Sequence, residues 1–127
     1  MKILYLSYAK YPDYQADSLF LGLRELLGAQ VVDVPKIDIL YKSTFEKDPD
    51  SIRKIGWGGG FTMYGLLDDI EVDRSNIIQK IHHREFDLVI YGGAYRALPL
   101  FQHVLRHYSR DKIVFIDGND DTVIQNE

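Results

Sequence analysis

The 127-residue chain contains no cysteine, which excludes a disulfide framework, a cysteine-based zinc site and a thiol nucleophile. It also lacks an excess of positive charge: 15 Lys and Arg stand against 19 Asp and Glu, so we expect no nucleic-acid partner. No apolar run approaches the roughly 20 residues of a membrane helix, and we expect no transmembrane segment. Because residues 1–6 also lack a secretory signal pattern, we predict a cytoplasmic location.

What the chain does contain is enough apolar material for a core. Hydrophobic residues make up 46% of it and aromatic residues 13%, a composition too apolar for a disordered chain. The length suits one domain and leaves little room for two. We therefore predict a single folded domain over residues 1–127, which is either a whole protein or the amino-terminal half of a longer two-domain protein.

Apolar runs alternate with amphipathic segments along the chain. The runs predict strands at 3–7, 30–34, 86–91 and 112–116, and the amphipathic segments predict helices at 18–27, 73–83 and 99–108. Asp17 or Ser18 is expected to cap the first helix, and Gly28 to end it. The alternation predicts a Rossmann-like α/β fold: a doubly wound parallel sheet in three α/β/α layers, with strand order second, first, third, fourth.

Residues 36–60 show no clear period and predict a long loop, with a short helix at 50–54 as an alternative. Its glycine run, Trp57 to Gly60, resembles a phosphate cradle but lacks the Lys-Ser/Thr of a P-loop, so we favour a lid or a plain turn. Residues 61–67 are expected to form a short strand or a turn.

The predicted topology places a ligand crevice at the carboxyl ends of the first and third strands, where the strand order reverses. Three loops should meet there. The candidate crevice residues are Ser7, Tyr8, Gly92, Gly93, Tyr95, Arg96, Asp117, Asn119, Asp120 and Asp121.

Each of these groups has a structural interpretation beside the functional one. Gly92 and Gly93 either admit a ligand close to the backbone or fit a tight turn. Arg96 suits a phosphate or carboxylate, although a solvated side chain is the simpler reading. The acidic residues that follow the last strand suit Mg²⁺, but we favour a polar loop that caps the next turn. We accordingly expect neither a metal nor a cofactor.

Histidines occur in two pairs. His103 and His107 are four residues apart on a helix, a spacing that permits metal binding, yet no glutamate stands between them as in a metalloprotease helix. We predict that both are exposed. His82 and His83 end their helix, where the helix dipole favours imidazolium.

Several well-known sites are absent. The loop after the first strand holds neither the Gly-x-Gly-x-x-Gly of a dinucleotide-binding domain nor the phosphate loop of a flavodoxin. The paired acids of a response-regulator receiver are missing as well. Ser7 has no Gly-x-Ser-x-Gly elbow, which argues against a hydrolase nucleophile.

Three segments resemble the amino-terminal half of a GT-B type glycosyltransferase. They are the opening strand with its helix and the Gly28-Ala29-Gln30-Val31 that follows, the Asp87-hydrophobic strand ending in Gly92-Gly93, and the strand 112–116 ending in Asp117-Gly118. The resemblance implies an acceptor-side domain that binds a sugar or glycan acceptor. It would not be catalytic alone, because a second domain in the same chain would bind the nucleotide sugar. It further implies an acceptor base in this half, for which Asp17, His82 and the Asp117 cluster are candidates.

The alternative is a stand-alone binding or interaction module without enzymatic activity. Nine tyrosines support it, since tyrosine is favoured at protein interfaces. Self-association would then use Tyr8, Tyr11 and Tyr14, and the ligand site would be the same crevice or the 36–60 loop.

Overall fold

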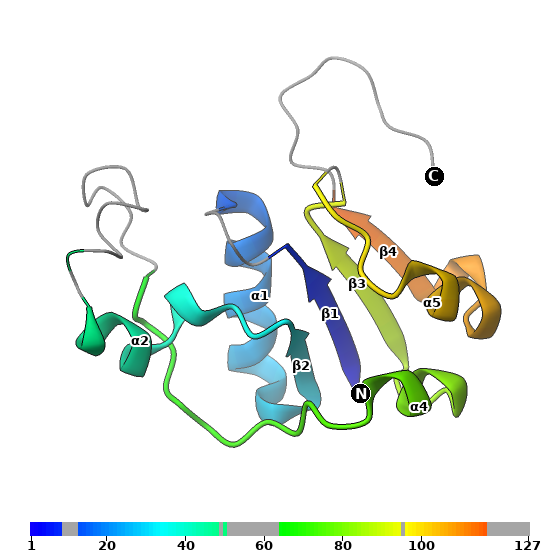
Figure 1. The fold of residues 1–127 in the computed structure, drawn as a ribbon, viewed down its shortest axis with the longest axis horizontal. Helices are drawn as coiled ribbons and strands as arrows, with labels where there is room; N and C mark the ends of the chain where they lie inside the picture. Colours follow the sequence, from blue (N-terminus) through cyan, green and yellow to red (C-terminus); the bar gives the residue numbers. More distant parts are fainter. Residues whose placement is uncertain (9–12, 49, 51–63, 95, 117–127) are drawn as a thin grey trace, which may run out of the picture.

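The computed structural model of the protein describes residues 1–8, 13–48, 50, 64–94 and 96–116. Its centre is one sheet of four parallel strands in the order β2-β1-β3-β4 (Figure 1). The strands are β1 (Ile3–Ser7), β2 (Val31–Val34), β3 (Leu88–Gly92) and β4 (Ile113–Ile116). The predicted fold class and strand order are confirmed.

Helices cover both faces of the sheet. Helix α1 (Tyr14–Leu27) packs on one face, and α4 (Ile77–His82) and α5 (Phe101–His107) pack on the other. Side chains of a strand alternate between faces, so Tyr5 meets Phe20 of α1 while Leu6 joins the core beneath α4 and α5. Every β1 residue is buried, as expected for a central parallel strand.

Helix α1 begins four residues earlier than predicted. Its N-cap is Asp13, not Asp17 or Ser18, because the Asp13 side chain accepts a hydrogen bond of 3.1 Å from the Ala16 N–H. This satisfies one of the free N–H groups of the first turn. Gly28 ends the helix with φ +60, as predicted. The earlier start brings Asp17 inside the helix, on its buried side.

The prediction of a long loop over 36–60 is wrong in its first part. Asp38–Leu40 forms a 3-10 helix, and Lys42–Lys47 forms α2. Tyr41 between them bridges Leu67 in parallel, and the Lys42 N–H donates to the Leu67 carbonyl over 2.9 Å. The alternative helix at 50–54 and the glycine run Trp57 to Gly60 lie outside the described residues, except for Asp50.

The other two helices begin later than predicted. The Asp73 carboxylate accepts from the Ser75 N–H over 2.9 Å, forming a local turn, and α4 starts only at Ile77. Pro99 also lies outside its helix: Leu100 has a left-handed φ of 59, and α5 starts at Phe101. Both errors have one cause, since residues that favour helix starts also favour the turns that precede them.

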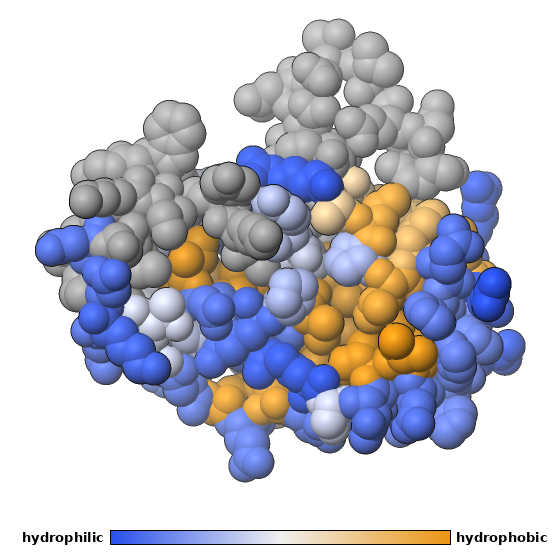
Figure 2. Space-filling model, viewed as in Figure 1, coloured by the Kyte–Doolittle hydropathy of each residue, from blue (hydrophilic) through white to orange (hydrophobic). Residues whose placement is uncertain are grey.

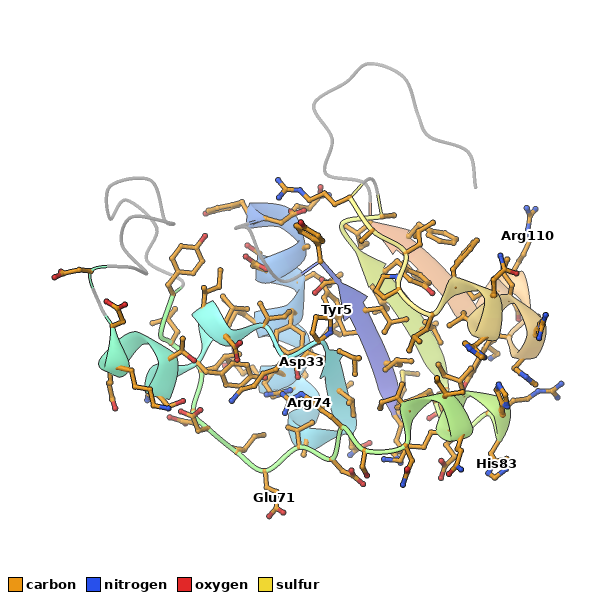
Figure 3. All side chains as sticks on the ribbon, in the orientation of Figure 1. Tyr5, Asp33, Glu71, Arg74, His83 and Arg110 are labelled. Atoms are coloured by element: carbon orange, nitrogen blue, oxygen red, sulfur yellow. The ribbon has the colours of Figure 1, made fainter. Side chains whose placement is uncertain are left out.

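A buried charged cluster, here called the Asp33 cluster, anchors the β2 edge of the sheet (Figure 3). The Asp33 side chain is fully buried and accepts hydrogen bonds from Tyr41 Oη at 2.8 Å and from the Ile37 N–H at 3.0 Å. Arg24 and Arg74 also contact its Oδ1, at 3.3 and 2.5 Å. The cluster therefore ties α1, β2 and two later segments together, and the sequence analysis did not predict it.

Figure 2 shows apolar surface over the β3, β4 and α5 side of the molecule. Partly buried hydrophobic residues that pack against the core beneath α4 and α5 include Leu98, Leu100, Phe101 and Phe115. Among the residues that the structure describes, no helix has the length and apolar character needed to cross a membrane.

Candidate functional site

The carboxyl ends of β1 and β3 enclose a small crevice. Ser7 and Gly92 are partners in the strand register, so the two strand ends lie side by side at this point. The cavity has a volume of about 10 Å³, which is room for one water-sized group. Its walls are formed by Ser7, Tyr8, Asp13, Ala16, Asp17, Gly92, Gly93 and Arg96.

Ser7 places a buried hydroxyl group in the wall of the crevice. Its residue is only 7% exposed, and its Oγ has no hydrogen-bond partner among the described residues. Burying a hydroxyl without a partner costs free energy, so natural proteins do so rarely. A ligand hydroxyl or a water in the crevice would satisfy it.

Asp17 brings a carboxyl group to the same crevice from the first turn of α1. The residue is 5% exposed, and its Oδ2 accepts a hydrogen bond from the Asp13 N–H at 3.2 Å. Burial raises the pKa of Asp17 to about 7; the nearby Asp13 charge adds to the rise, while the Asp13 N–H and the charge of Arg96 oppose it. A carboxyl group with such a pKa can take up or release a proton near neutral pH.

Glycine is required at position 92, the last residue of β3, and at position 93, which follows it. A Cβ added at Gly92 would lie 2.3 Å from Tyr5 Oη, and that hydroxyl donates to the Ala16 carbonyl over 2.6 Å. Gly93 has φ +98, which L side chains rarely adopt. Close packing explains Gly92 and a tight turn explains Gly93, so neither glycine requires a bound ligand.

The structure brings together five of the predicted crevice residues: Ser7, Tyr8, Gly92, Gly93 and Arg96. The other five, Tyr95, Asp117, Asn119, Asp120 and Asp121, lie outside the described residues. Sequence reasoning did not place Asp13, Ala16 and Asp17 at the crevice, although it named Asp17 as a candidate base. Predicting the start of this helix correctly would have placed them there, because residues four apart, such as Asp13 and Asp17, lie on the same side of a helix.

The histidines differ from their prediction. His103 and His107 are half-buried on α5, and His82 of α4 contacts both of them. The distance from His82 Nε2 to His103 Nδ1 is 3.1 Å, and the ring centroids of His82 and His107 are 4.3 Å apart. Packing of α4 on α5 buries them, which a single-helix pattern cannot show. Within the described ranges, no group of three or more His, Asp or Glu side chains has a geometry that could hold a metal ion.

Comparison with protein-family models, with curated proteins and with solved structures finds no match for this chain. The class of the protein therefore follows from its own architecture. It has a Rossmann-like α/β fold, with a polar crevice at the point where the strand order of the sheet reverses.

Proposed function

We propose that this is the acceptor-side domain of a GT-B type glycosyltransferase, and that its crevice binds one hydroxyl group of a sugar or glycan acceptor. A second domain of the same protein would bind the nucleotide sugar, in the cytoplasm. The observation that carries the proposal is the pairing of the buried Asp17 carboxyl with the unpartnered Ser7 hydroxyl in one cavity.

The size of the cavity supports a single hydroxyl as the bound group. About 10 Å³ admits one oxygen atom with its hydrogens but not a sugar ring, so the rest of the acceptor would lie outside the cavity. Ser7 Oγ would then hydrogen-bond the acceptor oxygen. Asp17 would accept the proton of that hydroxyl, in keeping with a pKa near 7.

The reaction can be written with these two residues and a donor held elsewhere. The acceptor oxygen attacks the anomeric carbon of the nucleotide sugar, and a new glycosidic bond forms. The bond from that carbon to the diphosphate breaks, and its electron pair leaves with the nucleotide. The acceptor proton passes to the Asp17 carboxylate, while Ser7 holds the acceptor oxygen.

The test measures whether acceptor saccharides bind to the protein, and it detects binding through the ionisation of Asp17. The carboxyl carbon of Asp17 is titrated by NMR, with and without a panel of mono- and oligosaccharides at millimolar concentration. We expect one class of saccharide to shift the Asp17 pKa and to bind about two- to tenfold more weakly to Ser7→Ala, as loss of a hydrogen bond predicts. The matched control is Ser75→Ala, whose hydroxyl bonds Asp73 outside the crevice.

Two results would contradict the proposal. One is a panel in which no saccharide perturbs Asp17 or its neighbours. The other is saccharide binding that Ser7→Ala and Ser75→Ala weaken equally, because the crevice would then have no part in it.

A stand-alone interaction module is the second candidate, and the exposure of Tyr14 favours it. This side chain is 66% exposed at the start of α1, and a large exposed aromatic residue suits a protein interface. The size of the native protein separates the two functions. An immunoblot band near 14.7 kDa supports the module, whereas a band two to three times larger supports the two-domain transferase.

A further inference from the structure

A second and larger cavity lies at the opposite end of the sheet, near the residues that lead into β3 and β4. Its volume is about 550 Å³, within the range of small-molecule sites. We call it the basic pocket and define it by Arg84, Asp87, Arg106, His107 and Lys112, which all line it. None of these residues belongs to the crevice at the other end.

The basic pocket concentrates positive charge in an acidic protein. Two guanidinium groups and one ammonium group face a single carboxylate, Asp87, whereas the whole chain has a net charge of −4. Among the described residues, Arg84, Arg106 and Lys112 form no ion pair with a carboxylate. The Asp87 Oδ2 accepts the Lys2 N–H over 2.8 Å, and the carboxylates of Glu85 and Asp111 lie near the pocket without lining it. The side chains that line the pocket therefore carry more positive than negative charge.

His107 lies within the field of these cations. Burial lowers the pKa of His107, and the neighbouring His82, Arg84, Arg106 and His103 lower it further. These neighbours come from α4, the turn after it and α5. A neutral His107 can still donate one hydrogen bond to an anion, and a bound anion would favour its protonated form.

Arginine is unusual at position 84 because the backbone there has a positive φ angle. Arg84 follows α4 with φ 53, in the left-handed region that glycine or asparagine normally occupies after a helix. Its N–H donates to the Ile81 carbonyl over 3.0 Å, which closes the helix end. Glycine would fit this position better, so the arginine side chain costs stability where it stands.

We propose that the basic pocket binds the phosphate group of a small phosphorylated ligand, with Arg84, Arg106 and Lys112 contacting the phosphate oxygens. Guanidinium groups match the geometry of phosphate and bind it with paired hydrogen bonds. The cavity has room for a phosphate together with a sugar-sized body. Its three cationic side chains are gathered in one pocket, which suits one phosphate group rather than the extended backbone of a nucleic acid.

The experiment titrates the full chain with inorganic phosphate at low ionic strength, using calorimetry and the NMR signals of His107. We expect saturable binding and a rise of the His107 pKa, with neither effect from chloride at equal ionic strength. Arg106→Gln should weaken phosphate binding about tenfold or more, as loss of a charge-assisted hydrogen bond predicts. The matched control is Arg110→Gln, which removes the same charge from an exposed neighbour that does not line the pocket (Figure 3).

Arg84→Gly separates binding from folding. Because glycine suits the left-handed backbone, we expect this variant to melt at a higher temperature than the natural protein while it binds phosphate more weakly. Equal losses in Arg106→Gln and Arg110→Gln would overturn the proposal, since binding would then follow net charge alone. A His107 signal unchanged by phosphate, or an oligonucleotide that binds more tightly than phosphate in an Arg106-dependent way, would overturn it too.

Discussion

The Tyr5 ring fills the space where a side chain at position 92 would stand. Tyr5 and Gly92 lie on the neighbouring strands β1 and β3, and the Tyr5 hydroxyl is fixed by its 2.6 Å hydrogen bond to the Ala16 carbonyl of α1. Burial raises the pKa of Tyr5, so this hydroxyl remains a donor at all ordinary pH values. The Tyr5 side chain thus connects α1 through its hydrogen bond and β3 through its packing against Gly92.

Gly92→Ala is expected to destabilise the protein. The new Cβ would lie 2.3 Å from Tyr5 Oη and 2.6 Å from its Cζ, and the buried ring has little freedom to move. Overpacking of this kind costs about 1–3 kcal/mol, which chemical denaturation followed by circular dichroism can measure.

Gly22→Ala is the control for that substitution. Gly22 lies within α1 with no atom within 4 Å of an added Cβ. Alanine there should stabilise the protein by about 0.5–1 kcal/mol, because it favours the helix more than glycine does. If Gly92→Ala were as stable as the natural protein, the packing of Tyr5 on residue 92 would be looser than described.

Asp33→Asn should be among the most destabilising polar substitutions. It removes the negative charge that Arg24 and Arg74 share. Neither guanidinium group can then move into water without breaking its other hydrogen bonds, so both stay at least partly buried without a counter-charge. Loss of one partner of a buried ion pair costs about 3–5 kcal/mol, measured as the free energy of unfolding.

The exposed pair Lys42–Asp68 provides the comparison for Asp33. Its ions are 2.6 Å apart, closer than Arg24 and Asp33, but both side chains are at least half exposed. We expect no measurable change in stability for Asp68→Asn, because water replaces the lost partner. Similar effects of the two substitutions would mean that burial of Asp33 is not what makes its cluster important.

Ser7→Ala is expected to leave stability unchanged or to raise it by up to about 1 kcal/mol, since it removes a buried hydroxyl that has no partner among the described residues. Binding of a crevice ligand should weaken in the same variant. Thermal melting and saccharide titration on one sample measure both quantities. A loss of stability would indicate that Ser7 Oγ serves the fold.

The sheet could be predicted from the sequence because each strand has a recognisable local run of apolar residues. Runs such as 3–6 and 113–116 are apolar without a break, and every strand is joined to the next through a helical segment. Such a chain has few unknotted ways to build a parallel sheet. The order of the four strands, and with it the place of the crevice, followed from this pattern.

Side-chain clusters could not be predicted in the same way. Asp33 reads as one polar residue inside a strand, and its partners Arg24 and Arg74 lie 9 and 41 residues away. The contact of His82 with His103 likewise needs two helices to be packed first. Asp17 was recognised as a candidate base, but its place in the crevice depends on a helix start that the sequence leaves ambiguous between three polar residues.

Asp17 should also make the protein less stable as the pH rises. Its pKa is about 7 in the folded protein and 3.8 as a free side chain, so the folded state holds the proton more tightly. The resulting stabilisation is complete below pH 3.8 and disappears as the pH passes through 7. Asp17→Asn removes this dependence, and it should be more stable than the natural protein at a pH of about 8, by on the order of 4 kcal/mol.

Asp73 should behave in the opposite sense, which makes Asp73→Asn the control. Hydrogen bonds from Ser75 and Lys80 hold the pKa of Asp73 well below its usual range, so its contribution is present above that range and is lost in acid. Denaturant unfolding between a pH of about 2 and about 8 measures both variants. Because the burial that raises the Asp17 pKa is also what would prepare it to accept a proton from a bound hydroxyl, an Asp17→Asn variant whose stability follows the same pH profile as the natural protein would remove the physical basis for Asp17 as the acceptor base.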